Sequence, residues 1–356
     1  MIKVNWHMKH LVINTYKFLF WLSGKLNSPL VPPKVIQISL TYRCNSRCNM
    51  CKIVDLLPAD EELSTQQILH IIDEAAKYGI TEAVFTGGEP FLREDIFTIC
   101  EYCYNKGLTS VITTNGTLID GNIAENITKS KVNHIHLSLD GLEETNDFFR
   151  GRGVFKKVRE AIRVLNEARN TNGSFSIGIA CTVMDRNVKE LYELVKLADD
   201  LSVDVINFQP LVNDNTNFLD KTLPSFWVKK ENIPVLEREI KRIRKYKPKH
   251  LTIYEEPHLE LLIKYYQGNL TRRDWVCFGG FKTVFICFSK NQPLVYSCHG
   301  VCGNLDRISL RRAWTSKEAY KLRLHSKNCK DLCMQSCYSQ ESSQSLTNLL
   351  RPCIKE

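Results

Sequence analysis

VIQISLT (residues 35–41) and CNSRCNMC (residues 44–51) dominate the interpretation of this sequence, because a strand-like run leads almost directly into three closely spaced cysteines. Three thiolates on one short loop can hold three corners of an iron–sulfur cluster, which usually takes four cysteines. The fourth iron would then keep an open coordination position, which suits a catalytic site that binds a small chelating molecule. The competing hypothesis is a zinc knuckle, which needs a fourth ligand close by. The nearest downstream histidine, His70, falls inside an expected helix, so we favour the cluster.

Strand-like runs alternate with helix-like runs through the first two thirds of the chain. The apolar residues of the segment 66–78 have helical spacing, with Ser64 or Thr65 as its N-cap. Such alternation predicts an α/β fold whose parallel sheet is open or forms an incomplete barrel. Functional sites of these folds lie at the carboxyl ends of the strands. The expected strands are 35–41, 82–86, 109–113, 134–139, 174–183 and 204–208.

Composition places the chain among ordinary globular proteins, apart from its cysteines. It has 356 residues, 14 of them cysteine, a hydrophobic fraction of 43% and a formal net charge of +9. A charge excess this small over such a length does not indicate nucleic-acid binding. No secretory cleavage site follows the N-terminal apolar run, so we expect a cytoplasmic protein without structural disulfides. Short and regular cysteine spacing then indicates metal binding.

We expect four segments along the chain. They are an amphipathic N-terminal segment (1–33), a core (34–215), a basic helical connector (216–249) and a cysteine-rich domain (250–356). The apolar run 11–22 contains Lys17 and is too short to span a bilayer. It is either an interfacial helix that makes peripheral membrane contact or, as we favour, a helix packed on the core.

The connector contains an expected helix, 233–246, with a dense basic face. We expect that face to be ordinary solvated surface, and the alternative is that it attracts an acidic partner. Its basic residues are Arg238, Lys241, Arg242, Arg244 and Lys245.

Together with later motifs, the cysteine loop resembles the radical S-adenosylmethionine superfamily. Cys-x3-Cys-x2-Cys after a first strand is that superfamily's signature, and the resemblance covers Lys34 to Leu211. GGEP (87–90), TNG (114–116), SLDG (138–141) and Arg150-Gly151 follow at later strand ends. The resemblance implies a partial (β/α)6 TIM-like barrel with a small cysteine-rich C-terminal domain. It also implies a 4Fe–4S cluster on Cys44, Cys48 and Cys51, S-adenosylmethionine as cofactor, and a 5′-deoxyadenosyl radical that takes hydrogen from a substrate.

The same resemblance implies a set of cofactor contacts at the strand ends. Glu89 is expected to accept a hydrogen bond from the ammonium group of S-adenosylmethionine. Arg150 is expected to pair with its carboxylate, since a guanidinium binds a carboxylate bidentately. The full set of expected contacts is Gly87, Gly88, Glu89, Pro90, Asn115, Ser138, Asp140, Arg150, Asn187 and Gln209.

The C-terminal cysteines resemble the SPASM or twitch extension of this superfamily. By that resemblance Cys277 and Cys298 bind an auxiliary cluster, with partners among Cys329, Cys333, Cys337 and Cys353. The run of cysteines is shorter than in a full extension, so one or two auxiliary clusters remain open, as does zinc. Cys287 lies within an apolar run and is expected to be a core residue.

The reaction is expected to oxidise or cross-link a peptide side chain or a sugar-like alcohol. Alternatives are an epimerase of peptide or sugar and a non-catalytic Fe–S electron-transfer protein, although the latter has no need of a ligand-binding series of motifs. The expected partners are a peptide or small-molecule substrate and an external one-electron donor such as flavodoxin or ferredoxin. Only 43 residues precede Cys44, so a leader-binding domain is expected to be missing or supplied in trans. No catalytic acid or base is assigned, and the residues considered are Asp214, Glu255, Glu256 and His258.

Overall fold

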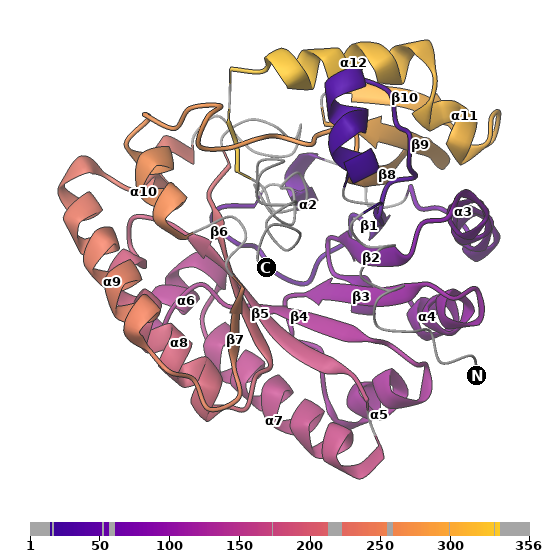
Figure 1. Cartoon of the computed structure of the whole chain (residues 1–356). Coiled ribbons are helices and arrows are strands. Elements are labelled where there is room, and N and C mark those ends of the chain that lie inside the picture. The colour runs from indigo at the N-terminus through magenta and orange to yellow at the C-terminus, as the bar shows by residue number, and fades with distance from the viewer. Residues whose placement is uncertain are drawn as a thin grey trace, which may run out of the picture.

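A single mixed sheet organises the protein. The computed structural model describes residues 15, 18–51, 53–56, 61–172, 174–212, 223–254, 259–298, 300–330 and 332–334. Ten strands of these residues form one sheet in the order β10-β9-β8-β1-β2-β3-β4-β5-β6-β7 (Figure 1). Their bounds are β1 Val35–Thr41, β2 Glu82–Gly87, β3 Thr109–Thr114, β4 His134–Ser138, β5 Ser176–Val183, β6 Val205–Pro210, β7 Thr252–Tyr254, β8 Thr283–Ser289, β9 Gln292–Ser297 and β10 Gly300–Asn304.

The strands from β1 to β7 pair in parallel with their sequence neighbours, which confirms the α/β fold and the parallel sheet. All six strands expected from the sequence are present, with ends within two residues of the predicted ones. The sheet curves as a partial barrel, and among the described residues β7 and β10 form its two edges.

The cysteine-rich end of the chain extends the same sheet. β8 pairs in parallel with β1, so that Val35 lies opposite Thr283. β9 and β10 then continue the sheet in antiparallel pairing. The cysteine-rich end is therefore hydrogen-bonded directly to the strand that precedes the cysteine loop.

Helices cover the outer side of the curved sheet (Figure 1). Alternation along β1 explains this, because Ile36, Ile38 and Leu40 are fully buried among the helices while Gln37 and Ser39 are half-buried on the other face. Ser64 caps its helix through a capping box, as one of the two expected caps. The helices are α2 Ile53–Leu56, α3 Thr65–Tyr78, α4 Ile96–Asn105, α5 Gly121–Lys129, α6 Glu143–Arg150, α7 Val154–Asn172, α8 Leu191–Asp200, α9 Ile233–Lys245, α10 Leu259–Tyr266, α11 Leu310–Trp314 and α12 Lys317–Asn328.

The N-terminal helix, residues 18–26, packs on the C-terminal region. Phe20 is buried against Phe278 and Phe281, and its ring centroid lies 4.8 Å from that of Phe278. For these residues, the helix packed on the core is the interpretation that the structure supports. No described helix is both long and apolar enough to cross a bilayer.

The basic helix α9 is partly neutralised by neighbouring carboxylates. Arg242 pairs with Glu239 and Glu193, both at 2.9 Å. Arg244 pairs with Glu260 of α10. This pairing fits the expectation of ordinary surface better than that of a docking face.

Candidate functional site

The cysteine loop follows β1 and is tied to the end of α6. The Asn49 amide donates to the Phe149 carbonyl oxygen at 2.8 Å, and the Asn49 side chain donates to the Phe148 carbonyl oxygen at 2.5 Å. Cys44 and Cys48 are half-buried and Cys51 is exposed, all as free thiols. Burial raises the pKa of the Cys48 thiol to about 11, and the nearby Arg150 charge opposes that shift.

Among the described residues, no three Cys, His, Asp or Glu side chains are grouped closely enough to hold one metal ion. A zinc knuckle needs such a group, because its ligands lie about 2.3 Å from one ion.

Two glycines let the second strand's loop lie against the cysteine loop. The Gly88 amide donates to the Thr41 carbonyl oxygen at 2.7 Å, and the Glu89 amide donates to that of Arg43 at 2.8 Å. A Cβ at Gly88 would lie 2.0 Å from the Arg43 carbonyl oxygen, and one at Gly87 would lie 2.2 Å from that of Thr41. The two glycines therefore allow the backbone after β2 to lie directly against the backbone that leads into the cysteine loop.

Glu89 joins the ends of the second and third strands. It is fully buried and accepts hydrogen bonds from the Thr114 hydroxyl and the Asn115 amide, both at 2.8 Å, and from the Phe91 amide at 3.1 Å. Burial raises the pKa of the Glu89 carboxyl, and these hydrogen bonds oppose the shift. The Asn115 side chain donates to Asn45 Oδ1 at 2.8 Å and lies 3.8 Å from Cys44 Sγ. Glu89 and the cysteine loop thus share one hydrogen-bond network.

Arg150 approaches the cysteine loop from the fourth strand's side. Its Nε donates to Asp140 Oδ2 at 2.7 Å, and Asp140 Oδ1 accepts from the Thr182 amide at 2.7 Å. Burial lowers the pKa of the Arg150 guanidinium, but the charges of Asp140 and Cys48 outweigh burial and raise it. The guanidinium therefore stays charged between a carboxylate and a cysteine of the loop.

Asn187 serves the structure of the site. It is fully buried, and its amide donates to the Asp140 carbonyl oxygen at 2.9 Å and to that of Thr182 at 2.7 Å. Its oxygen accepts from the Met184 amide at 2.8 Å. Both amide hydrogens are thus used within the protein, and these bonds hold together the ends of β4 and β5.

The remaining expected contacts lie at the same edge of the sheet. Ser138 ends β4 and Gln209 lies in β6, both half-buried. Pro90 is buried at the start of the 3-10 helix η1, Pro90–Leu92. The strand ends thus bring these residues to the rim that carries the cysteine loop.

An apolar wall beside Cys48 is a feature that sequence reasoning missed. Met50, Phe149, Met184 and Leu211 form a buried cluster against which Cys48 packs. Met50 lies inside the cysteine motif, and it was the only residue near the cysteines whose apolar side chain could have indicated this cluster. Apolar side chains here exclude water from one side of the loop.

Three of the expected auxiliary ligands converge in the C-terminal region. Cys277, Cys298 and Cys333 pack in one small cluster with Val212 and Phe285. Burial raises the pKa of the Cys277 thiol to about 12, and the charges of Cys333 and Cys329 add to that shift. Cys329 is therefore close as well, whereas Cys337 and Cys353 lie outside the described residues, as do Asp214, Glu255, Glu256 and His258.

Two further cysteines of this region are placed apart from that cluster. Cys287 is half-buried in β8, and its Sγ lies 3.8 Å from Ser39 Oγ of β1. Cys302 is buried, and its thiol donates to the Val295 carbonyl oxygen at 3.4 Å. The thiols of Cys287 and Cys302 thus each contact another group of the protein, a hydroxyl in one case and a carbonyl oxygen in the other.

Known proteins share this fold and part of this sequence. Residues 38–198 match the model of the Radical SAM superfamily. Fe-coproporphyrin III synthase of Methanosarcina barkeri is 33% identical over 180 residues, covering 50% of this chain and 44% of that protein. PqqA peptide cyclase of Granulibacter bethesdensis is 33% identical over 144 residues, covering 40% and 38%. The chain thus matches less than half the length of either relative.

Solved structures extend the similarity of fold beyond the matched domain. Streptococcus suis SuiB bound to S-adenosylmethionine has a TM-score of 0.66 at 16% identity, covering 90% of this chain and 74% of that one. SuiB bound to its precursor peptide SuiA has a TM-score of 0.62 at 16% identity, covering 85% and 69%. Coverage of 90% and 85% of the chain reaches beyond residues 38–198 into at least part of the cysteine-rich end.

Proposed function

The chain carries a radical SAM domain, and we propose that it cleaves S-adenosylmethionine reductively in order to oxidise or cross-link a side chain of a peptide substrate. The superfamily's cofactors are a 4Fe–4S cluster and S-adenosylmethionine. The observation that carries the proposal is that the loop of Cys44, Cys48 and Cys51 lies beside Glu89 and Arg150 at one rim of the sheet. PqqA peptide cyclase and the SuiB complex with a precursor peptide support a peptide substrate.

We assign the three thiols of the loop to the cluster. Cys44, Cys48 and Cys51 would hold three irons of a four-iron cluster, and the remaining iron would be available to S-adenosylmethionine. When bound, the cluster supplies the electron that breaks a sulfur–carbon bond of S-adenosylmethionine, and the resulting 5′-deoxyadenosyl radical takes a hydrogen atom from the substrate. The apolar wall around Phe149 and Met184 keeps water from that side of the loop.

Glu89 and Arg150 are assigned to the two charged groups of the methionine part. A carboxylate offers about four lone-pair sites, and Glu89 uses three of them within the protein, which leaves one for an ammonium group. Asp140 holds the Arg150 Nε, which orients the guanidinium for a carboxylate. Asn187 and Glu190 then stabilise the backbone that carries Asp140 and Leu142.

We assign Cys277, Cys298, Cys329 and Cys333 to one auxiliary cluster. A cluster there supplies an electron acceptor for the substrate radical, so that loss of a hydrogen atom, then of one electron and a proton, gives a net oxidation. On this proposal the core is 34–215 and the auxiliary domain is 250–356, joined by the connector 216–249.

Formation of 5′-deoxyadenosine tests the proposal. The full chain is reconstituted anaerobically with iron and sulfide, given dithionite and S-adenosylmethionine, and the product is quantified by chromatography. We expect 5′-deoxyadenosine from the wild type and none from Cys44→Ala/Cys48→Ala/Cys51→Ala. Cys103→Ala, a buried thiol of α4, is the matched control and should keep the activity. A wild type that shows cluster absorbance but forms no 5′-deoxyadenosine would instead be an electron-transfer protein.

A further inference from the structure

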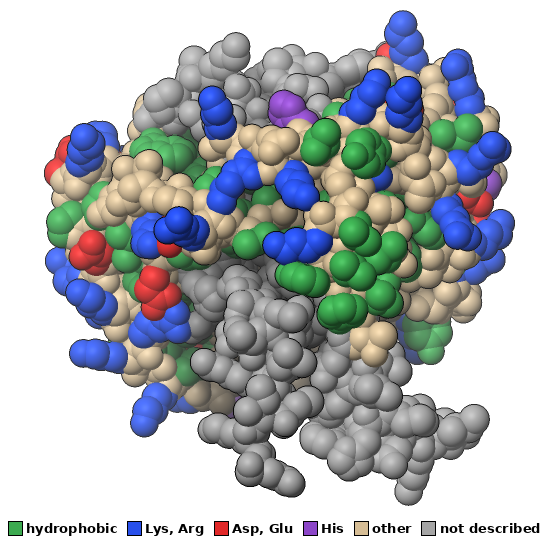
Figure 2. Space-filling model, turned by 45° about the horizontal axis from the view of Figure 1, so that its top comes forward, with side chains coloured by type: hydrophobic (Ala, Val, Ile, Leu, Met, Phe, Trp, Pro, Cys, Tyr) green, Lys and Arg blue, Asp and Glu red, His purple; other side chains and the backbone are tan. Residues whose placement is uncertain are grey.

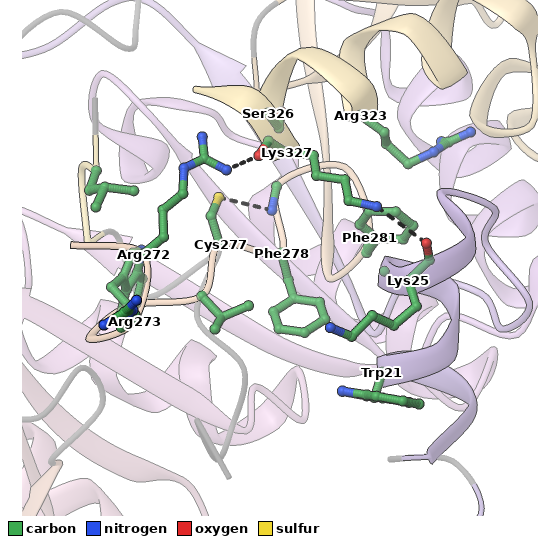
Figure 3. A pocket seen from close by; sticks show the side chains of 15 residues that line it. Trp21, Lys25, Arg272, Arg273, Cys277, Phe278, Phe281, Arg323, Ser326 and Lys327 are labelled. Carbon is green, nitrogen blue, oxygen red and sulfur yellow. Dashed lines mark hydrogen bonds between the residues drawn. The ribbon is translucent and has the colours of Figure 1, made fainter. Parts of the chain in front are cut away.

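A pocket of about 360 Å³ opens where the N-terminal helix meets the C-terminal region (Figure 3). Its walls are the helix 18–26, the segment 272–281 and α12. Cys277, one of the proposed auxiliary ligands, lines it. The pocket is thus separate from the cysteine loop and borders the auxiliary region.

Positive charge surrounds this pocket without any acidic residue in its lining. Lys25, Arg272, Arg273 and Lys327 are exposed at its rim. Lys25 Nζ lies over the Trp21 ring, Lys327 Nζ donates to the Lys25 carbonyl oxygen, and Arg272 donates to backbone carbonyl oxygens of Lys327 and Cys329. Within the described part of the chain, no salt bridge joins any of these four to a carboxylate. In Figure 2, the charged side chains at the centre of the face are Lys and Arg, set among hydrophobic and other atoms.

Two further donors belong to lining residues but are buried. Trp275 and Arg323 both line the pocket, at 4% and 2% exposed. Trp275 Nε1 and Arg323 Nε have no acceptor among the described residues. Both nitrogen atoms are themselves buried, and Arg323 Nη1 donates to the Trp314 carbonyl oxygen at 2.8 Å, so these donors are not offered to a ligand in the pocket. The charge that a ligand in this pocket would meet is therefore the positive charge of the four exposed side chains at its rim.

The pocket also has apolar walls, and its cations lie on opposite sides. Trp21, Phe278 and Phe281 provide aromatic surface, and Val276 is 47% exposed. In Figure 3, Arg272 and Arg273 lie on one side, and Lys25 and Trp21 lie on the other. A compact anion such as phosphate would need donors that converge on one point. Separated cations with apolar surface between them suit an extended ligand that carries several carboxylates and an apolar side chain.

We propose that this pocket binds an acidic segment of the peptide substrate, outside the part that reacts; this rests on the proposed function. Its carboxylates would face the two cationic sides, and an apolar side chain would pack on the aromatic wall.

Binding of a defined peptide tests this inference without any turnover. The probe is a fluorescein-labelled octapeptide of alternating Glu and Leu, with a Gln-for-Glu version as reference, titrated by anisotropy against the reconstituted full chain without S-adenosylmethionine. We expect saturable binding of the Glu peptide, weakened by salt, and at least about tenfold weaker binding of the Gln peptide. The double variant Lys25→Glu/Arg273→Glu should bind the Glu peptide at least about tenfold more weakly than the wild type does.

Lys241→Glu/Lys245→Glu on α9 is the matched control, because it changes the net charge equally at two exposed lysines remote from the pocket lining. We expect it to bind the Glu peptide like the wild type. Equal weakening by both double variants would overturn the inference, since only overall charge would matter. If orthophosphate or phosphatidylserine vesicles displaced the Glu peptide as well as unlabelled Glu peptide does, the inference would also be overturned. The pocket would then be a general anion site or a membrane site. Failure of binding with intact 5′-deoxyadenosine formation would reject this pocket alone and leave the proposed function standing.

Discussion

Gly88 is the residue at which the backbone of the site has least room. Because the atom that a Cβ would meet there is a backbone carbonyl oxygen, Gly88→Ala must displace the loop that leads to Cys44. We expect a loss of roughly 3 kcal/mol in unfolding free energy and a marked loss of 5′-deoxyadenosine formation. Gly121→Ala is the matched control, since a Cβ there meets nothing within 4 Å and the position is helical. Urea denaturation measures both, and equal stability of the two variants would contradict this account.

Sequence reasoning located the site but not the partners of each side chain. The motifs predicted that Glu89, Asp140 and Arg150 would lie near the cysteine loop, because parallel strands end at one edge. Spacing alone did not reveal that Asp140 pairs with Arg150 or that Asn187 donates to two backbone carbonyl oxygens. Those bonds depend on how β4 and β5 lie side by side, and no local pattern records that.

Asp199 links α8 to the chain that leads into β7. It is 2% exposed and accepts from the amides of Lys249, His250 and Leu251 and from the Tyr246 hydroxyl. Burial raises the pKa of this carboxyl, but the four groups that donate to it outweigh burial and lower the pKa to about 2. A depressed folded-state pKa means that the ionised carboxylate stabilises the fold above the unfolded-state pKa of about 3.9 and stops doing so as pH falls towards 2.

Asp199→Asn should therefore cost about 2 kcal/mol of unfolding free energy at pH 7. The difference from wild type should persist at pH 5 and shrink below pH 4, where the wild-type carboxylate begins to be protonated. Asp200→Asn, an exposed neighbour, should stay within about 0.5 kcal/mol of wild type. Urea midpoints at several pH values measure this, and a penalty that does not change with pH would disprove the role given to charge.

Elements were predictable where their pattern is local. The six parallel strands and α3 follow from hydrophobic periodicity, and their observed bounds differ by two residues at most. The addition of β8 to β1 was not foreseen, because parallel pairing between residues 35 and 283 leaves no signal near either strand. The apolar run around Cys287 was recognised, but its place beside Ser39 depended on that pairing.

Taken as a whole, the molecule joins two cysteine regions through one sheet. β1 leads into the loop of Cys44, and its neighbour β8 belongs to the region that brings Cys277, Cys298 and Cys333 together. The position of one region is thus fixed relative to the other by backbone hydrogen bonds. If each region holds a cluster, removal of the first should leave the second intact.

Iron content separates the two regions experimentally. We expect Cys44→Ala/Cys48→Ala/Cys51→Ala, reconstituted anaerobically, to retain about four irons per chain, because Cys277, Cys298, Cys329 and Cys333 suffice for one cubane. Adding Cys277→Ala and Cys298→Ala should remove them, whereas adding Cys100→Ala, a fully buried thiol of α4, should not. Iron assay together with absorbance near 400 nm gives the count. About eight irons in the triple variant would mean a second auxiliary cluster, which needs ligands beyond these four. Near zero would show that the C-terminal cysteines hold no cluster, and the oxidising role given to that region would fall with it.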